Sequence, residues 1–176
     1  MITLAIDPAT ITFTVYGSAV PAGSKTPWNP RRKDGSLVLR ADGRPVIATM
    51  DSTKQHGRNW KNAVASAARE AYQGELLRGP VQVVFEFFRV RPGGHFGKGG
   101  LNKKGRDTPF PITKPDLLKV ARAIEDSLTG VVWTDDAQIV AEILTKQWGE
   151  PARVVVSVRQ VGAEVLRAPE RGTCDD

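Results

Sequence analysis

The chain has 176 residues, of which 40% are apolar and 25% are charged, and this is the size of one globular domain. A chain of this length buries enough surface to fold without a disulfide or a metal. Its one cysteine has no partner in the chain, which excludes a disulfide framework and a zinc-ribbon site. The sequence has no long apolar stretch of about 18 residues and no signal-peptide pattern, so we expect a cytoplasmic protein without a membrane partner.

The net charge is +6, and about half of the basic residues gather in two loops. In the first loop, residues 17–45, the basic residues are Lys25, Arg31, Arg32, Lys33, Arg40 and Arg44. In the second loop, residues 89–106, they are Arg89, Arg91, Lys98, Lys103, Lys104 and Arg106. Clustered positive charge attracts polyanions such as nucleic acid. The second loop also has six glycines and no acid, so it could approach a ligand closely, although a solvated flexible linker has a similar composition.

The first half of the chain predicts two strands, a hairpin and a helix. They are a strand at 11–16, a hairpin of 37–40 and 44–49 around Ala41-Asp42-Gly43, a helix from a cap at Asp51 or Ser52 to about Tyr72, and a strand at 81–90. The first strand alternates and is rich in β-branched residues, and the helix carries an apolar stripe that includes Trp60, which we expect in the core. The strand at 81–90 is apolar at nearly every position, as expected for a strand that is covered on both faces.

The second half predicts a helix and two further strands. The helix has Pro115 in its first turn and runs to about Leu128, and the strands are 138–148 and 152–161. The turn Gly149-Glu150-Pro151 favours a hairpin between these two strands. Residues 164–176 are charged and aperiodic, so we expect a disordered tail after a domain of residues 1–163. The order of elements predicts a single α/β domain, a mixed sheet with two helices packed on it.

Acids and bases are combined around this second helix. Asp116 stands at its start, Lys119 shares its face one turn on, and Arg122 lies at the margin of that face. Asp135 and Asp136 precede the next strand, where adjacent side chains point to opposite faces, so we expect at most one of them to join Asp116. Two simpler interpretations stay open: Asp116 as a first-turn acid favoured by the helix dipole, and the aspartate pair as an ordinary turn.

Acids at the ends of two elements, beside basic loops, are typical of a metal-dependent nuclease. Carboxylates that are held close together repel one another unless a cation neutralises them. Mg²⁺ takes hard oxygen ligands and keeps several of its waters. In nucleases such an ion polarises the phosphoryl group and orients the attacking hydroxide.

Several motifs then follow one another between residues 114 and 139. They are Lys114-Pro115-Asp116, the basic Arg122, Asp126-Ser127-Leu128, Gly130, and Trp133-Thr134-Asp135-Asp136-Ala137-Gln138-Ile139. In these motifs the chain resembles the RusA family of Holliday junction resolvases, which is typical of bacteriophages and prophages. Weaker similarity, at Val20-Pro21 with Lys25 and from Arg91-Pro92 to His95-Phe96-Gly97, extends the resemblance over most of residues 11–160.

The resemblance implies a RusA-like fold and a Mg²⁺-dependent endodeoxyribonuclease that resolves four-way junctions in recombination and repair by paired phosphodiester hydrolysis, leaving 5′-phosphates. It also implies a homodimer on branched DNA in the bacterial host cell, with Mn²⁺ as a substitute metal and no small-molecule cofactor. The implied metal ligands are Asp116 and Asp136, with Asp135 as a candidate third. The implied catalytic residues are Asp116, Asp136 and Arg122, and we expect Lys119 to join them by contacting the scissile phosphate. The expected DNA contacts are Lys25, Arg31, Arg32, Lys33, Arg91, His95, Lys98, Lys103, Lys104, Arg106 and Lys114.

The chain departs from the family at Leu118, where the family has its second acid. Leucine cannot bind a metal, so either another acid takes over, or metal binding is weaker, or the protein is a non-catalytic or weakly catalytic structure-selective DNA-binding protein. The acids that could take over are Glu125, Asp126 and Asp135, although Asp126 is expected mainly as a partner of Lys119 or Arg122. Without the resemblance, a basic RNA-binding domain would be a third hypothesis.

Overall fold

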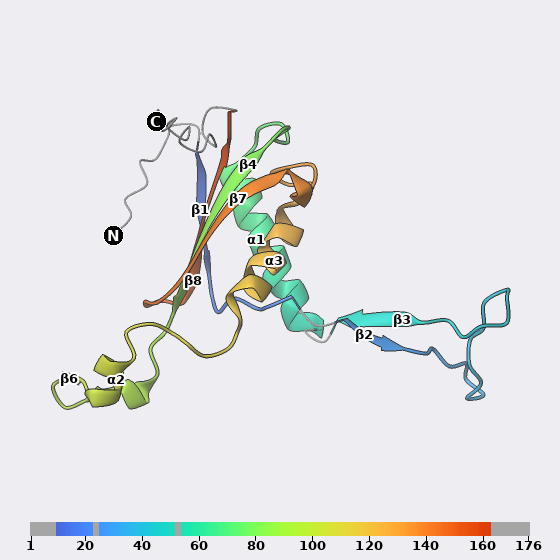
Figure 1. The fold of residues 1–176 in the computed structure, drawn as a ribbon, viewed down its shortest axis with the longest axis horizontal. Helices are drawn as coiled ribbons and strands as arrows, with labels where there is room; N and C mark the ends of the chain where they lie inside the picture. Colours follow the sequence, from blue (N-terminus) through green and yellow to red (C-terminus); the bar gives the residue numbers. More distant parts are fainter. Residues whose placement is uncertain (1–9, 23–24, 52–53, 163–176) are drawn as a thin grey trace, which may run out of the picture.

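A four-stranded mixed sheet forms the centre of the molecule (Figure 1), and the computed structural model describes residues 10–22, 25–51 and 54–162. The strands, in order across the sheet, are β1 (Ile11–Tyr16), β8 (Arg153–Gln160), β4 (Val81–Arg89) and β7 (Ile139–Trp148). β8 is antiparallel to both of its neighbours, and β4 and β7 are parallel. The mixed sheet and the strand at 11–16 confirm the prediction from the sequence.

Two helices, α1 (Lys54–Ala71) and α3 (Leu117–Leu128), pack on one face of this sheet (Figure 1). The apolar arc of α3 is buried, as predicted, and it meets the apolar stripe of α1, in which Trp60 is 6% exposed. The residues that fill this core are valine, alanine, leucine, isoleucine and aromatic side chains from both helices and from β1, β4 and β8. The single α/β domain with two helices on one sheet is therefore confirmed.

The burial of β4 differs from the prediction. Val81, Val83, Phe85 and Phe87 are buried, whereas the residues between them are only partly buried. The reason is that both packing helices lie on the same face, so β4 is covered on one side by α1 and α3 and, among the described residues, by no helix on the other. A nearly continuous apolar run, interrupted by Gln82 and Glu86, therefore did not mean a strand enclosed on both faces.

The predicted hairpin of the last two strands is wrong, because β4 lies between β7 and β8. The chain leaves β4, passes through α3 and returns as β7 alongside β4, which is a parallel crossover. β4 is thereby paired on both edges, the position that suits the most apolar strand. The turn at residues 149–151 consequently connects two strands that are not neighbours.

Two segments extend away from the sheet and helices (Figure 1). The arm, residues 25–51, has the antiparallel strands β2 (Lys25–Trp28) and β3 (Ala48–Asp51) at its base. Its outer part is held by the isolated bridges Arg31↔Leu37 and Leu39↔Pro45. The second bridge, with backbone hydrogen bonds from Arg40 to Arg44 and from Val46 to Val38, confirms the predicted hairpin of 37–40 with the first residues of 44–49, whereas Ala48 and Thr49 belong to β3. The module, residues 91–110, contains η1 (Gly93–His95), β5 (Phe96–Gly97), β6 (Gly100–Leu101) and α2 (Lys103–Asp107).

The ends of both long helices differ slightly from the prediction. Asp51 is the last residue of β3 rather than a helix cap, and Ser52 lies outside the described residues. α3 begins after Asp116, so Pro115 precedes the helix instead of lying in its first turn.

The predicted tail of residues 164–176 lies outside the described residues. Among the helices that the structure describes, none has the length and apolar character that crossing a membrane requires.

Candidate active site

Asp116 is the N-terminal cap residue of α3, but its side chain makes no capping hydrogen bond. Its carboxylate instead forms an ion pair with Lys119, with 3.2 Å between Oδ2 and Nζ, and both side chains are 57% exposed. The pair joins two residues one turn apart, as predicted from the helical spacing. Asp116 therefore presents an accessible carboxylate that the fold does not use as a cap.

Asp135 and Asp136 differ in their surroundings: Asp135 caps a short helix, whereas Asp136 is exposed. Asp135 caps the short helix η2 (Asp136–Gln138), where its carboxylate accepts a 2.9 Å hydrogen bond from the backbone N–H of Ala137. The Gln138 side chain accepts from the Asp135 backbone N–H and donates to the Leu77 carbonyl, which ties the turn to the start of β4. These hydrogen bonds leave Asp136 exposed, so of the two it is the one whose carboxylate is free to meet a ligand.

Asp116 and Asp136 lie at opposite ends of α3. The twelve residues of this helix span about 18 Å. β7 then runs back along the helix, and its Lys146 donates a 3.2 Å hydrogen bond to the carbonyl of Pro115, next to Asp116. Asp136 lies before the start of β7, at the far end of that strand from Lys146. One chain thus holds the two predicted metal ligands apart.

The acids offer the hard carboxylate oxygens that Mg²⁺ prefers, so the chemistry of the donors fits this ion. Their arrangement in one chain does not, because no three His, Cys, Asp or Glu side chains within residues 10–22, 25–51 and 54–162 are placed to hold a metal ion together. The rest of the ligands would therefore have to come from water, from the nucleic acid or from a second chain.

A second group of acids surrounds Glu125 near the end of α3. Burial, followed by a hydrogen bond with Glu142 of β7 and by the negative charges of Glu142, Asp136 and Asp126, raises the pKa of Glu125 from its ordinary value of 4.5 to about 8. Glu125 lies near Asp136 and far along the helix from Asp116, so its role as a replacement ligand stays a prediction and concerns the Asp136 side alone. Glu142 was not predicted.

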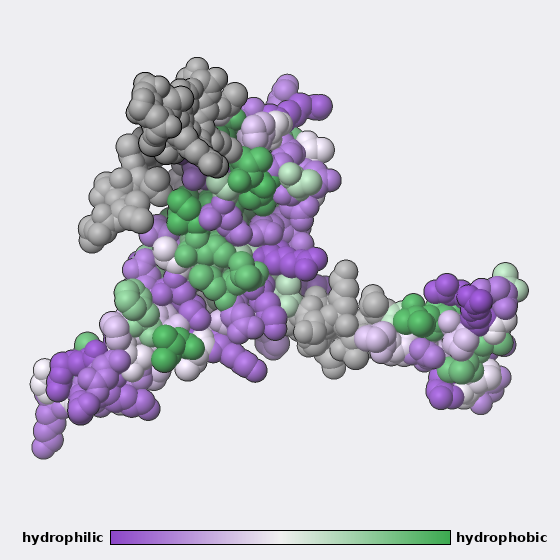
Figure 2. Space-filling model, in the orientation of Figure 1, coloured by the Kyte–Doolittle hydropathy of each residue, from purple (hydrophilic) through white to green (hydrophobic). Residues whose placement is uncertain are grey.

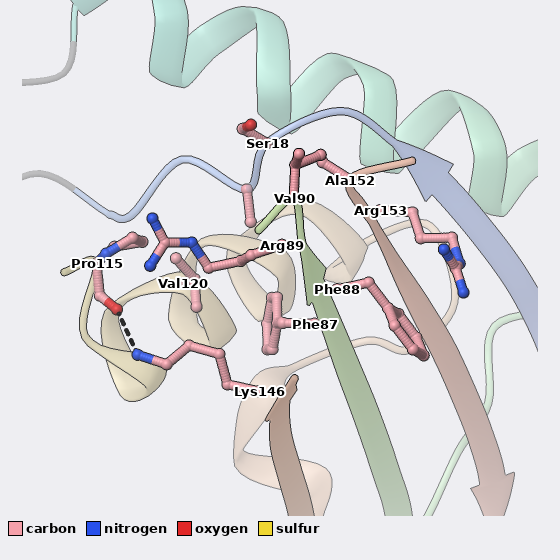
Figure 3. A pocket seen from close by; sticks show the side chains of 11 residues that line it. Ser18, Phe87, Phe88, Arg89, Val90, Pro115, Val120, Lys146, Ala152 and Arg153 are labelled. Carbon is pink, nitrogen blue, oxygen red and sulfur yellow. Dashed lines mark hydrogen bonds between the residues drawn. The ribbon is translucent and has the colours of Figure 1, made fainter. Parts of the chain in front are cut away.

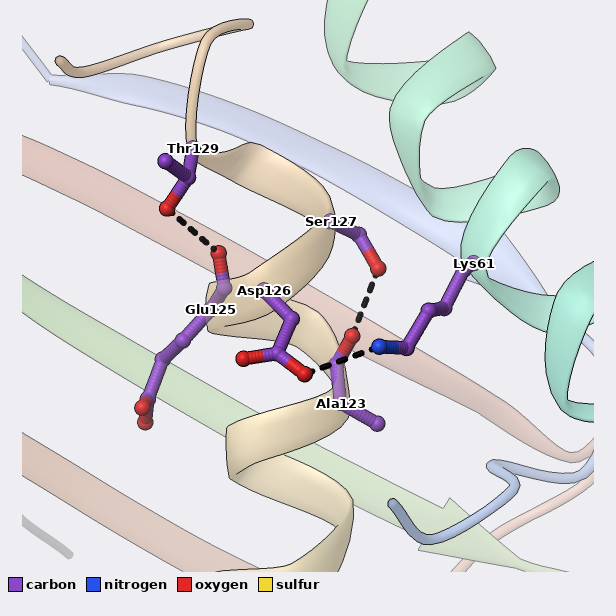
Figure 4. Close-up of polar contacts among 6 residues, drawn as sticks. All are labelled: Lys61, Ala123, Glu125, Asp126, Ser127 and Thr129. Atoms are coloured by element: carbon purple, nitrogen blue, oxygen red, sulfur yellow. Dashed lines mark hydrogen bonds and ion pairs between the residues drawn. The ribbon is translucent and has the colours of Figure 1, made fainter. Parts of the chain in front are cut away.

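Asp126 has a structural partner, but not the one expected. Its carboxylate binds Lys61 of α1 with 2.8 Å between Oδ2 and Nζ, rather than Lys119 or Arg122. Figure 4 shows this pair pointing toward one another between the two helices, with Glu125 pointing away from it. The pair fastens α3 to α1 and takes Asp126 out of the set of free acids.

Two other positions of α3 are on the surface. Leu118 is 70% exposed, which excludes the core role that an apolar residue at this position could have had. Arg122 is also exposed, one turn further along the helix. The surface beside Asp116 therefore carries an apolar side chain where the family has an acid, and a substitution there disturbs no packing.

The arm presents predicted DNA contacts at its tip. Arg31, Arg32 and Lys33 are exposed, and Arg31 also donates a 2.8 Å hydrogen bond to the carbonyl of Gly35. The acids of the arm fold its turns, for example Asp34, which accepts from the backbone N–H of Ser36. The side chain of Lys25 lies outside the described residues. Arg31, Arg32 and Lys33 are therefore exposed at the tip, and the neighbouring Asp34 is hydrogen-bonded to Ser36 within the turn.

Arg91 and His95 were predicted as DNA contacts, and the structure places both against Trp148 of β7. Arg91 stacks on the Trp148 ring at 5.1 Å and donates to the carbonyl oxygens of Gly105 and Thr108 at 2.7 and 3.1 Å. His95 is 6% exposed and meets the same ring edge to face. These two side chains hold the module together and attach it to the sheet, and their contact with DNA stays a prediction.

The remaining predicted contacts of this region are exposed. They are Lys98, Lys103, Lys104 and Arg106 in the module and Lys114 beyond it. Lys103 pairs with Asp107, and Arg106 donates to the carbonyl of Leu101. Figure 2 shows hydrophilic residues over the module and over much of the tip of the arm. The segment predicted as a mobile glycine-rich loop is thus a small folded unit with a basic surface.

Comparison with known proteins gives these residues a context. The chain is similar to an uncharacterised protein of Bacillus subtilis (strain 168), YqaN, with 29% identity over 156 residues that cover 87% of this chain and 98% of that protein. The family described as endodeoxyribonuclease RusA matches residues 38–159, which is well over half of the chain and includes α3, the aspartate pair and most of the sheet. The chain therefore belongs to the RusA endodeoxyribonuclease family, a family of Holliday junction resolvases that act on branched DNA.

Proposed function

We propose that this protein is a Mg²⁺-dependent endonuclease that resolves four-way DNA junctions in the host cytoplasm during recombination and repair, with Asp116 and Asp136 as its metal ligands. The observation that carries the proposal is that both carboxylates are exposed, stand at the positions of the family motif and are not used to cap α3 or η2. Mn²⁺ would substitute for Mg²⁺, since both accept carboxylate oxygens.

Each residue near these acids has a part in the proposal. A bound Mg²⁺ would polarise the phosphoryl group that is attacked. Lys119, which is 57% exposed beside Asp116, would contact the scissile phosphate and stabilise the negative charge that develops there. Arg122 would contact the same strand one turn along α3. Asp135 could act as a third ligand only through the oxygen that the N–H of Ala137 does not engage.

The separation of Asp116 from Asp136 is the reason that a homodimer is part of this proposal. A single copy keeps them at the two ends of a helix that is about 18 Å long, whereas two copies can place Asp116 of one beside Asp136 of the other. Two such composite sites, related by a two-fold axis, would suit a four-way junction that needs two symmetric cuts.

Mixed variants test the metal ligands and the dimer together. Asp116→Asn and Asp136→Asn should each abolish Mg²⁺-dependent cleavage of a synthetic four-way junction while junction binding persists. If the sites are composite, co-refolded mixtures of the two variants recover nicking, because one site of each mixed dimer then has both aspartates. If both acids served a site within one chain, every site would lack one acid and the mixture would stay inactive.

Asp126→Asn is the matched control, because it removes an acid of α3 that is already paired with Lys61. It should keep full cleavage. Full activity of Asp116→Asn or Asp136→Asn would overturn the assignment of the ligands.

A non-catalytic junction-binding protein is the second candidate, and Leu118 is the observation that favours it, because this exposed position lacks the acid of the family. The wild-type protein would then bind four-way junctions and leave them uncut at every concentration of Mg²⁺ or Mn²⁺. Titrating both metals against a fixed junction separates the two candidates.

A further inference from the structure

We propose that Lys146 of β7, assisted by Arg89 of β4, is a positioning residue that holds the backbone in front of Asp116 and so fixes the direction of this carboxylate. The inference rests on the proposed role of Asp116. Lys146 is not part of the motif between residues 114 and 139 on which the resemblance to the family rests.

The contacts of Lys146 converge on one short segment, residues 113–115. Its Nζ donates hydrogen bonds to the carbonyl oxygens of Thr113 and Pro115, at 3.1 and 3.2 Å. Arg89 donates from the neighbouring strand to the carbonyl and the hydroxyl oxygen of Thr113, at 3.2 and 3.3 Å. Figure 3 shows the Lys146 amine reaching the Pro115 carbonyl, which is bonded directly to the nitrogen of Asp116.

The two cations stand on a rigid support. β4 and β7 are adjacent parallel strands, and Lys146 is paired in register with Phe87, a core residue of β4. Lys146 thus points to the face of the sheet that the helices cover, where it lines a cavity of about 150 Å³ together with Phe87, Val120 and Pro115. A lysine at such a place needs polar partners, and two of its three N–H groups find them in the segment before Asp116.

Asp116 depends on this segment for its orientation. Its side chain makes no capping bond, and among the described residues its carboxylate is held directly by the exposed ion pair with Lys119. The position of its main chain is set on one side by the first hydrogen bonds of α3 and on the other by Pro115. Groups that orient a metal ligand typically change metal affinity or activity by about 10- to 100-fold when they are removed.

The test compares Lys146→Met with Lys146→Arg in the full chain. Lys146→Met keeps the length and apolar stem of the side chain and removes its donors. It should raise the Mg²⁺ concentration for half-maximal junction cleavage by about 10-fold or more, with junction affinity nearly unchanged. Lys146→Arg should recover much of the loss, because its guanidinium can still donate to the two carbonyls.

Lys61→Met is the matched control, since it removes another lysine that ties down α3 but acts at Asp126. It should lower stability without changing the dependence on Mg²⁺. If Lys146→Met reduces the thermal unfolding midpoint too far, Arg89→Met tests the same segment from β4 and should shift the Mg²⁺ dependence in the same direction.

The outcomes separate this inference from the proposed function. Loss of cleavage in Asp116→Asn together with an unchanged Mg²⁺ dependence in Lys146→Met and Arg89→Met would overturn the positioning role alone. Full cleavage by Asp116→Asn would remove the proposed role of that acid and, with it, this inference. A shift in Mg²⁺ dependence that Lys146→Arg reverses, and that Lys61→Met does not produce, would support it.

Discussion

The sheet with its two helices and the pair of projections are stabilised in different ways. In the former, side chains such as Phe85 and Val156 are completely buried, and the stability comes from apolar packing. In the arm and the module, large apolar side chains such as Ile47 and Phe110 are 58% and 62% exposed, and local hydrogen bonds shape the turns. The comparison teaches that stability comes mainly from the sheet and its helices, so substitutions in the arm and the module, where nucleic-acid contact is proposed, should change stability little.

The largest expected effect is in the sheet. Phe85→Ala removes a fully buried ring from the central strand and should lower the free energy of unfolding by about 3–5 kcal/mol. Phe110→Ala in the module should change it by less than about 0.5 kcal/mol, because that ring is 62% exposed. Chemical denaturation of both variants measures the difference, and similar losses would contradict the division into two regions.

The charges of the projections should act on affinity alone. The double variants Arg32→Ala with Lys33→Ala and Lys98→Ala with Lys104→Ala each remove two exposed cations. If both cations contact phosphates, each pair should flatten the slope of log K against log salt by about 1.8 on duplex arms. Arg58→Ala with Arg69→Ala removes two exposed cations from α1 and serves as the control. A projection whose variant keeps the wild-type slope faces solvent instead of DNA.

Gly105→Ala should unfold the module locally. A Cβ at Gly105 would overlap the carbonyl oxygen of His95, whereas a Cβ at Gly99 meets nothing within 4 Å. Amide hydrogen exchange should become faster between residues 93 and 107 in Gly105→Ala, with β4 as protected as in the wild type. Gly99→Ala should leave exchange unchanged. Faster exchange in β4 as well would mean that the module and the sheet unfold together.

Glu125 makes stability depend on pH. Because folding raises its pKa from 4.5 to about 8, the protonated form is favoured in the folded state, and the resulting stabilisation is complete below pH 4.5 and lost as the pH rises through about 8. Glu125→Gln should remove most of this decline and stabilise the protein by about 1 kcal/mol at pH 8, a value reduced to allow for the half-exposed position of the carboxyl. Urea unfolding at pH 5 and pH 8 measures it, with the exposed Glu70→Gln as control.

A small stabilisation is expected from an acid at Leu118. Leu118→Asp places an acid in the first turn of α3, where the helix dipole favours it by about 0.3–1 kcal/mol, and no packing is lost because the side chain is 70% exposed. Beside Asp116 the new carboxylate should lower the Mg²⁺ concentration for half-maximal cleavage. Leu118→Asn removes the same apolar group without adding charge and should leave this concentration unchanged.

Much of the fold could be predicted from the sequence, because its elements have clear periods. The alternation of 11–16 and the apolar arc of α3 are local signals, and both elements form as predicted. The order of strands has no local signal, since a short turn at 149–151 is compatible both with a hairpin and with a connection across β4. The fold of the module could not be predicted from the sequence either, because Arg91 is held by Trp148, which is distant in sequence.

The candidate site was predictable where residue type and motif coincide, as at Asp116 and Asp136. The roles of their neighbours were not, because they depend on contacts between distant segments. Lys146 reads as one polar residue in an alternating strand, and its partners lie 31 and 33 residues earlier in the chain. Glu142 is likewise an ordinary strand residue until α3 places Glu125 beside it.

Because both ends of α3 are anchored to the sheet, the helix fixes the distance between Asp116 and Asp136. One end is tied to β4 and β7 through residues 113–115, and the other through the turn that Gln138 fastens to Leu77. The length of the helix, more than the identity of its exposed residues, therefore sets the spacing of the two carboxylates. The arm and the module lie outside this interval, so either could grow or shrink by several residues, and change its reach over a substrate, without moving the acids relative to one another.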